Sequence, residues 1–69
     1  MKRRVLEQLN VVLDENGAPR ACGRENCKKA IHLAETLRPG IYFGNVETGY
    51  MDTESLFSLK KELEKELEG

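Results

Sequence analysis

The Pro39-Gly40 pair constrains this chain most, because it separates two segments of different character. Proline disfavours helical geometry at the residue before it, and glycine adopts backbone angles that other residues avoid. The segment before the pair has apolar residues at helical spacing. The window that follows holds every aromatic side chain, namely Tyr42, Phe43, Tyr50 and Phe57. We therefore predict a helix that ends near residue 38 and a connection with a structure of its own.

The segment before this pair has the pattern of an amphipathic helix. Its apolar residues fall at i, i+3, i+4, i+7 and i+10, which places them on one narrow stripe. They are Cys27, Ala30, Ile31, Ala34 and Leu37. We predict a helix over residues 24–38. Because alanine lets a neighbouring backbone approach closely, we expect this helix to pack at the centre of the domain.

The C-terminal segment begins with residues that favour the start of a helix. Asp52 or Thr53 supplies an N-cap oxygen, and Glu54 places an acidic residue in the first turn. The apolar positions that follow are Leu56, Phe57, Leu59, Leu63 and Leu67. We predict a helix over residues 53–67.

Two structures are compatible with the N-terminal segment. Apolar residues at positions 5, 6, 9, 12 and 13 follow helical spacing and Asn16-Gly17 supplies a stop, which predicts a helix over about residues 4–14. The alternative is a β-hairpin over residues 10–22. It is favoured by β-branched Val11 and Val12, which precede a stretch rich in turn-forming residues.

The aromatic segment 41–51 combines aromatic and β-branched residues with glycines, a composition that favours short extended pieces. The sequence thus predicts a mainly α fold, a small three-helix domain with the extended segment 41–51 folded across it. Helices 24–38 and 53–67 are expected to pack as a hairpin, with residues 4–14 as the third element. An α+β fold, with the hairpin at 10–22 and strands from 41–51, is the alternative.

The length of the chain limits its stability. Its 69 residues form one small domain, 1–69. A chain this short buries only roughly 60% of the surface that its unfolded form exposes. Such a core supplies no more than about 3–5 kcal/mol unless something else stabilises it. We therefore expect a protein partner or self-association, with a homodimer as the simplest form.

Hydropathy argues against a membrane location. The longest run of large apolar residues is Val11-Val12-Leu13, far shorter than the roughly 18 residues that a membrane-spanning helix needs. The basic start, Met1-Lys2-Arg3-Arg4, is followed by neither an apolar stretch nor a cleavage site of a secretory signal. We expect a cytoplasmic protein with no membrane partner.

The sequence offers no recognisable catalytic set. His32 is the only histidine, and no serine or cysteine pairs with it in the sequence. Ser55 and Ser58 stand near the start of a helix, where hydroxyl groups commonly bond to the backbone. The glutamates of the last helix are spread around an exposed face, so no carboxyl group with a raised pKa is expected beside a base. We predict a protein that is not an enzyme, with no catalytic residues and no cofactor.

Cys22, Cys27 and His32 form a C-x4-C-x4-H pattern, which lies at the edge of zinc-ligand spacing and lacks a fourth ligand. On a helix, His32 is rotated by about 140° from Cys27, away from the cysteines. The C-x4-C spacing also differs from the tight C-x-x-C of redox motifs. We predict no metal site, and keep a thiol or zinc switch at the cysteine pair as a lesser alternative.

The net charge of −1 hides a gradient along the chain. Residues 1–38 carry eight Lys and Arg against five Asp and Glu, whereas residues 39–69 carry three against seven. A basic half of this kind can present a surface to an anionic partner. The candidate nucleic-acid-binding residues are Lys2, Arg3, Arg4, Arg20, Arg24, Lys28 and Lys29.

Two short stretches resemble a known DNA-binding family. Leu33-Ala34-Glu35-Thr36-Leu37 and Asn45-Val46-Glu47-Thr48-Gly49 are similar to the second-helix and third-helix ends of phage-repressor-type helix-turn-helix domains. The likeness covers under a third of the chain. Pro39-Gly40 and Gly44 interrupt the segment that would form the recognition helix, the element that such domains lay in the major groove. We do not assign the chain to this family.

The aromatic window supplies the main functional hypothesis. Phe43 and Phe57 are expected in the core, whereas the hydroxyl groups of Tyr42 and Tyr50 favour positions in contact with water. We expect a small protein-interaction or adaptor module, able to self-associate, that binds its partner through Tyr42, Tyr50 and Met51. A nucleic-acid-binding transcriptional regulator, acting through the basic residues, is the alternative.

Overall fold

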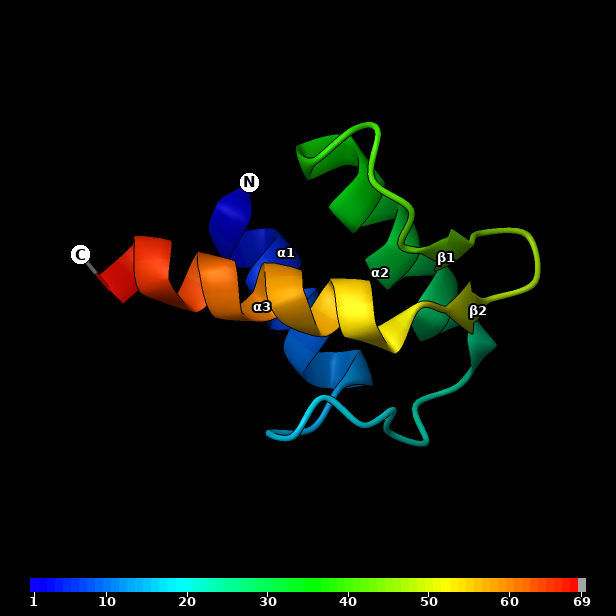
Figure 1. Cartoon of the computed structure of the whole chain (residues 1–69). Helices are drawn as coiled ribbons and strands as arrows, with labels where there is room; N and C mark the ends of the chain where they lie inside the picture. Colours follow the sequence, from blue (N-terminus) through cyan, green and yellow to red (C-terminus); the bar gives the residue numbers. More distant parts are fainter. Residues whose placement is uncertain (69) are drawn as a thin grey trace.

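A computed structural model describes residues 1–68 of the chain. It contains three helices and one small antiparallel sheet (Figure 1). The elements are α1 (Lys2–Val12), α2 (Arg24–Leu37), β1 (Gly44–Asn45), β2 (Tyr50–Met51) and α3 (Thr53–Glu68). The prediction of a mainly α domain with an extended aromatic segment is confirmed. Within residues 1–68, none of the helices is long and apolar enough to span a bilayer.

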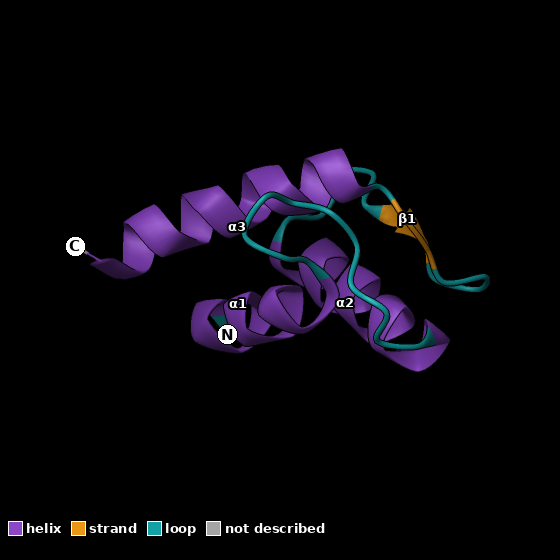
Figure 2. Cartoon of the chain, turned by 90° about the horizontal axis from the view of Figure 1, so that it is seen from below, coloured by secondary structure: helices purple, strands orange, loops and turns teal. Residues whose placement is uncertain are grey.

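Helix α1 packs against both other helices. Its buried residues Val5, Leu9 and Val12 are completely shielded from solvent. Both α2 and α3 make most of their interhelical contact with α1 and touch each other little, as the two views in Figures 1 and 2 show. The predicted hairpin of helices 24–38 and 53–67 is therefore wrong, whereas α2 contacts α1, α3 and both strands.

Helices α2 and α3 touch each other little because of the course of the chain after α2. The connection turns back along the gap between α2 and α3, and Phe43 fills that gap with a side chain that is only 1% exposed. A ring between two helices prevents their close contact. The complete set of buried apolar residues comprises Val5, Leu9, Val12, Leu13, Ala30, Ile31, Leu33, Ala34, Phe43, Leu56, Leu59 and Leu63.

The segment between α1 and α2 combines the two structures that the sequence left open. Residues 10–12 are helical, so the strand proposed there is wrong, but Leu13 is extended and pairs with Pro19 in an isolated β-bridge. Asp14 fixes the turn, because its Oδ1 accepts hydrogen bonds from the backbone N–H groups of Asn16 and Ala18, at 2.8 and 3.0 Å. These bonds, the one from Ala18 before the one from Asn16, lower the pKa of the Asp14 carboxyl.

Helix α3 holds this turn in place through a buried cation. Lys60 is 6% exposed, and its Nζ donates a hydrogen bond to the backbone oxygen of Asp14 at 3.2 Å. Gly17 lies against the Phe57 ring so closely that a Cβ there would come within 2.6 Å of it. The turn therefore covers one side of α3 at a position where no larger residue fits.

The β1–β2 hairpin is the second irregular element. Gly44 pairs with Met51 and Asn45 with Tyr50. Asn45 Oδ1 accepts bonds from the backbone N–H groups of Glu47 at 2.9 Å and Thr48 at 3.3 Å, which shapes the turn between the strands. The hairpin ends at Asp52, whose N–H donates to the Phe43 oxygen at 2.9 Å, directly before α3 begins.

Gly44 offers a test of how tightly this hairpin is packed. Its φ is +137°, and a Cβ at this position would collide with the Tyr50 backbone oxygen and come within 3.0 Å of Ile31 Cδ1. We expect Gly44→Ala to lower the free energy of unfolding by about 2–3 kcal/mol, from backbone strain and overpacking together. Urea unfolding followed by circular dichroism measures this loss.

Gly40→Ala is the matched control, because Gly40 also has a positive φ, +91°, but a Cβ there would meet nothing within 4 Å. Its cost should be confined to backbone strain, about 1 kcal/mol. Equal losses of unfolding free energy for the two variants would show that Gly44 is not packed tightly against β2 and α2.

Candidate interaction surface

The two tyrosines of the sequence hypothesis lie on the surface. Tyr42 is 59% exposed and Tyr50 is 66% exposed. Ile41 and Val46 are exposed as well, so four of the six exposed large hydrophobic residues in the described chain fall within residues 41–50. We call Ile41, Tyr42, Val46 and Tyr50 the aromatic surface.

Rigid neighbours position this surface. Tyr50 stands on β2 opposite Asn45, and the two strands lie against α2. Gly49 approaches Arg24 so closely that a Cβ would come within 2.7 Å of Arg24 Cγ. Met51, the third residue predicted for partner binding, is partly buried and packs against the core. Met51 therefore contributes to the hairpin's attachment more than to its outer face.

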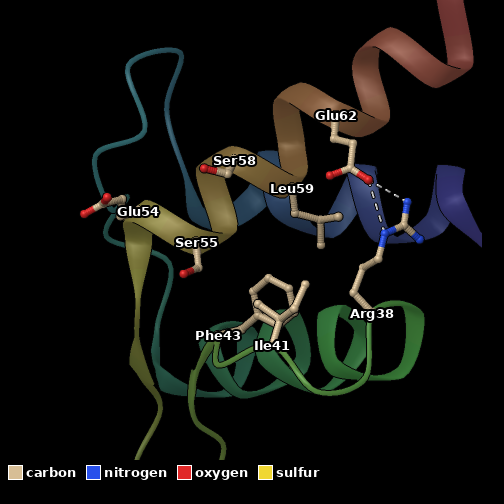
Figure 3. Close-up of a pocket in the computed structure, with 8 residues that line it drawn as sticks. All are labelled: Arg38, Ile41, Phe43, Glu54, Ser55, Ser58, Leu59 and Glu62. Carbon is tan, nitrogen blue, oxygen red and sulfur yellow. Dashed lines mark hydrogen bonds and ion pairs between the residues drawn. The ribbon is translucent and has the colours of Figure 1, made fainter.

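A small cavity is lined by Ile41, one residue of the aromatic surface. It has a volume of about 180 Å³ and lies between the connection after α2 and the first turns of α3 (Figure 3). Phe43, Leu59 and Ile41 give it an apolar wall, as the close-up shows. The complete lining consists of Arg38, Ile41, Phe43, Glu54, Ser55, Ser58, Leu59 and Glu62.

Sequence reasoning missed this cavity. The signal that could have indicated it is the alternation of residues 41 and 43, which share a face in an extended segment and so both meet α3. What the sequence could not show is that α2 and α3 stay apart at this point.

Ion pairs close one end of the cavity. Arg38 Nη2 lies 2.9 Å from Glu62 Oε1 and 3.3 Å from Glu66 Oε2, and Lys2 Nζ lies 2.8 Å from Glu66 Oε1. The hydrogen bond with Glu62 raises the pKa of the Arg38 guanidinium. The hydrogen bond from Lys2, ahead of the charge of Arg38, lowers the pKa of the Glu66 carboxyl. The ends of α1 and α2 are thereby tied to α3.

These ion pairs predict how stability depends on pH. Because the pKa of Glu66 is lower in the folded state, its contribution is complete above the unfolded pKa and is lost as the pH falls through the folded value. We expect Glu66→Gln to lower the melting temperature near neutral pH and to approach the wild type as the pH falls through the lowered pKa of Glu66. Thermal unfolding between these limits measures the convergence.

Glu68→Gln removes the same charge from the same helix, at a residue without an ion pair among the described residues. The melting temperature of this variant should differ from that of the wild type by a small amount that is the same at every pH. A Glu66→Gln curve parallel to that of the wild type down to acid pH would contradict the stabilising role of these pairs.

The aromatic surface lies in a stretch of the chain that has acidic residues but no basic ones. Residues 39–59 contain Glu47, Asp52 and Glu54, and no Lys, Arg or His. Two cations come near from α2, but Arg38 is paired with Glu62 and Glu66, and the stem of Arg24 packs beside Gly49. Glu54 is exposed, lines the cavity and forms no ion pair among the described residues.

The basic residues of the alternative hypothesis are only partly brought together. Arg4 of α1 and Lys29 of α2 line one groove of about 200 Å³, which also contains Glu7. Arg3 stands beside Arg4 in the first turn of α1, and Arg24 and Lys28 are one helical turn apart on α2. Arg20 stabilises the turn before α2, because its Nε donates a hydrogen bond to the Leu13 backbone oxygen at 2.9 Å.

The cysteine pair lies at the start of α2, where both side chains are half-buried and the thiols are free. Burial, ahead of the neighbouring Cys22 thiol, raises the pKa of Cys27. His32 is exposed on the same helix. Over residues 1–68, no three His, Cys, Asp or Glu side chains cluster in a way that could hold a metal ion.

The raised pKa of Cys27 predicts slow alkylation. Because the thiolate is the reactive form, Cys27 should react with iodoacetamide at pH 8 several-fold more slowly in the folded protein than in urea. Peptide mapping by mass spectrometry after timed quenching gives the rate. Equal rates in the folded and unfolded protein would place the Cys27 thiol outside the environment described here.

The cavity also contains two hydroxyl groups. Ser55 Oγ donates to Asp52 Oδ2 at 3.2 Å, and the backbone N–H of Leu56 donates to the Asp52 oxygen at 3.1 Å. These are the bonds of a helix start, in which short polar side chains satisfy one another and the backbone. Ser58 is exposed on the next turn of α3. The arrangement orders the first turn of α3 and leaves both hydroxyls at the cavity rim.

The segment that would hold a recognition helix has a different structure. Residues 38–52 form a loop and the β1–β2 hairpin, and no helix lies between α2 and α3. The resemblance to helix-turn-helix domains therefore does not extend to the element that such domains insert into DNA. Comparison with known proteins gives no match, neither to a family model nor to a curated protein nor to a solved structure.

Proposed function

We propose that this protein is a non-enzymatic protein-interaction module that binds a partner through the aromatic surface. The observation that supports this most is the exposure of Tyr42 and Tyr50 in a domain with few large side chains. Tyrosine supplies a large and rigid contact area, and aromatic residues are enriched at the centres of protein interfaces. Tyr50 stands on β2, which lies against α2, and Tyr42 directly precedes the buried Phe43, so little conformational freedom is lost on binding.

The basic groove of Arg4 and Lys29 offers less support for the nucleic-acid alternative. Glu7 lies in the same groove and opposes phosphate binding. A protein that relies on phosphate contacts loses affinity steeply as salt rises, whereas an aromatic interface depends less on salt. The salt dependence of whichever interaction is detected distinguishes the two functions.

The double variant Tyr42→Ser/Tyr50→Ser tests the proposal. Because both rings are exposed, we expect its melting temperature to stay within about 4 °C of the wild type. We expect its affinity for a partner retained from an extract of the producing cells to fall about tenfold or more. Sedimentation velocity on the same proteins measures self-association through this surface.

Val11→Ser is the matched control, because Val11 is 42% exposed but lies on α1, outside the aromatic surface. It should retain the partner. Loss of folding in the double variant would place the rings in the core, and equal retention by all three proteins would remove the aromatic surface as the binding site.

A further inference from the structure

We propose that the cavity and the aromatic surface together bind a basic segment of another protein, which inserts one aliphatic side chain into the cavity. Lys or Arg side chains beside this anchor would meet the carboxylate of Glu54 at the rim of the cavity. The inference rests on the proposed function and specifies the chemistry of the partner.

The size of the cavity indicates an anchor side chain as its occupant. Pockets for drug-sized ligands have volumes of roughly 300–1,000 Å³. At about 180 Å³, with an open mouth between Ile41 and α3, this cavity has room for one side chain of the size of leucine. Interfaces commonly bury a few such anchors in pockets and surround them with polar contacts.

The walls of the cavity match an aliphatic group. Phe43 and Leu59 are 1% and 3% exposed, so their side chains are fixed by packing. Figure 3 shows Phe43 and Ile41 side by side, facing Leu59. Ser55 and Ser58 stand at the rim beside Glu54, where polar groups of a bound backbone would lie.

The charge around the cavity indicates a basic partner. Residues 39–59 carry three acidic groups and no basic group, and Arg38 already has two carboxylate partners. A cation that approaches Glu54 therefore meets no repulsion from its neighbours in sequence. Exposed tyrosine rings also attract Lys and Arg through cation–π contacts, worth roughly 0.5–1 kcal/mol at exposed sites.

The same charges argue against pairing of this surface with itself. In a two-fold symmetric dimer, each group on the patch lies near the same patch of the other subunit. Glu47, Asp52 and Glu54 would then lie near the same carboxylates of the other subunit, with Arg24 beside Gly49 as the one nearby cation without an ion pair among the described residues. A partner with different, basic chemistry suits the surface better than a second copy of it.

Two synthetic peptides test this inference. The first is acetyl-Lys-Lys-Leu-Lys-Lys-amide, and the second has glycine in place of leucine. We expect the leucine peptide to bind about tenfold more tightly, as burial of one aliphatic side chain implies. Titration into ¹⁵N-labelled protein should shift the amide signals of residues 41–43 and 54–59 first.

Two variants with the same net charge make the test specific. Glu54→Gln should weaken binding of the leucine peptide several-fold, whereas Glu68→Gln, at the far end of α3, should leave it unchanged. Ser58→Phe, which places a ring at the cavity mouth, should remove the preference for leucine. Equal binding of both peptides, or shifts spread over all carboxylates of α3, would overturn the inference.

The peptide experiment can fail independently of the experiment that tests the proposed function. If Tyr42→Ser/Tyr50→Ser loses a cellular partner but the peptides show no leucine preference, the surface binds a partner of other chemistry and only this inference fails. If the cavity signals shift with protein concentration alone, the occupant is a second copy, which also overturns it. If the double variant retains its partner, the proposed function fails regardless of the peptides.

Discussion

The burial of Phe43 between α2 and α3 determines most of what is distinctive in this structure. A chain of this length has few large side chains to fill the space between two helices that both pack against a third. Here the connection after Pro39-Gly40 supplies the ring, and α1 supplies the common surface of Val5, Leu9 and Val12. The connection keeps α2 and α3 apart, and Ile41 lies opposite Leu59 (Figure 3). The cavity is the part of the gap that Phe43 leaves unfilled.

Part of the charge gradient along the sequence is used for ion pairs within the molecule. Lys2 and Arg38, from the basic half, pair with Glu62 and Glu66 of the acidic last helix. Such pairs contribute little each when exposed, but they tie the ends of three helices together. These ion pairs involve only Glu62 and Glu66, so they do not reach the first turn of α3. Residues 39–59 contain three acidic residues and no basic residue. The surface with the exposed tyrosines thus belongs to a stretch of net negative charge.

Local patterns in the sequence were enough to predict the helices, but not their arrangement. The apolar stripe of α2, the capping residues of α3 and the break at Pro39-Gly40 act over a few residues and are visible in the chain. The contact of Lys60 Nζ with the Asp14 oxygen joins residues far apart, and no local pattern indicates it. The same holds for the packing of both α2 and α3 against α1. Exposure of Tyr42 and Tyr50 was predictable from their hydroxyl groups, whereas the half-buried position of Met51 was not.

The division of the four aromatic residues is the strongest physical reason to assign a role to the surface. Phe43 is buried and Phe57 packs against the core, whereas both tyrosines face water beside Ile41 and Val46. Burial of one large apolar side chain stabilises a fold by roughly 1.5–3 kcal/mol, a large share of what so small a core provides. A domain of twelve buried apolar residues that leaves two rings outside forgoes that stabilisation. Contact with a partner at this surface would recover part of it, because binding to the folded state alone also stabilises the fold.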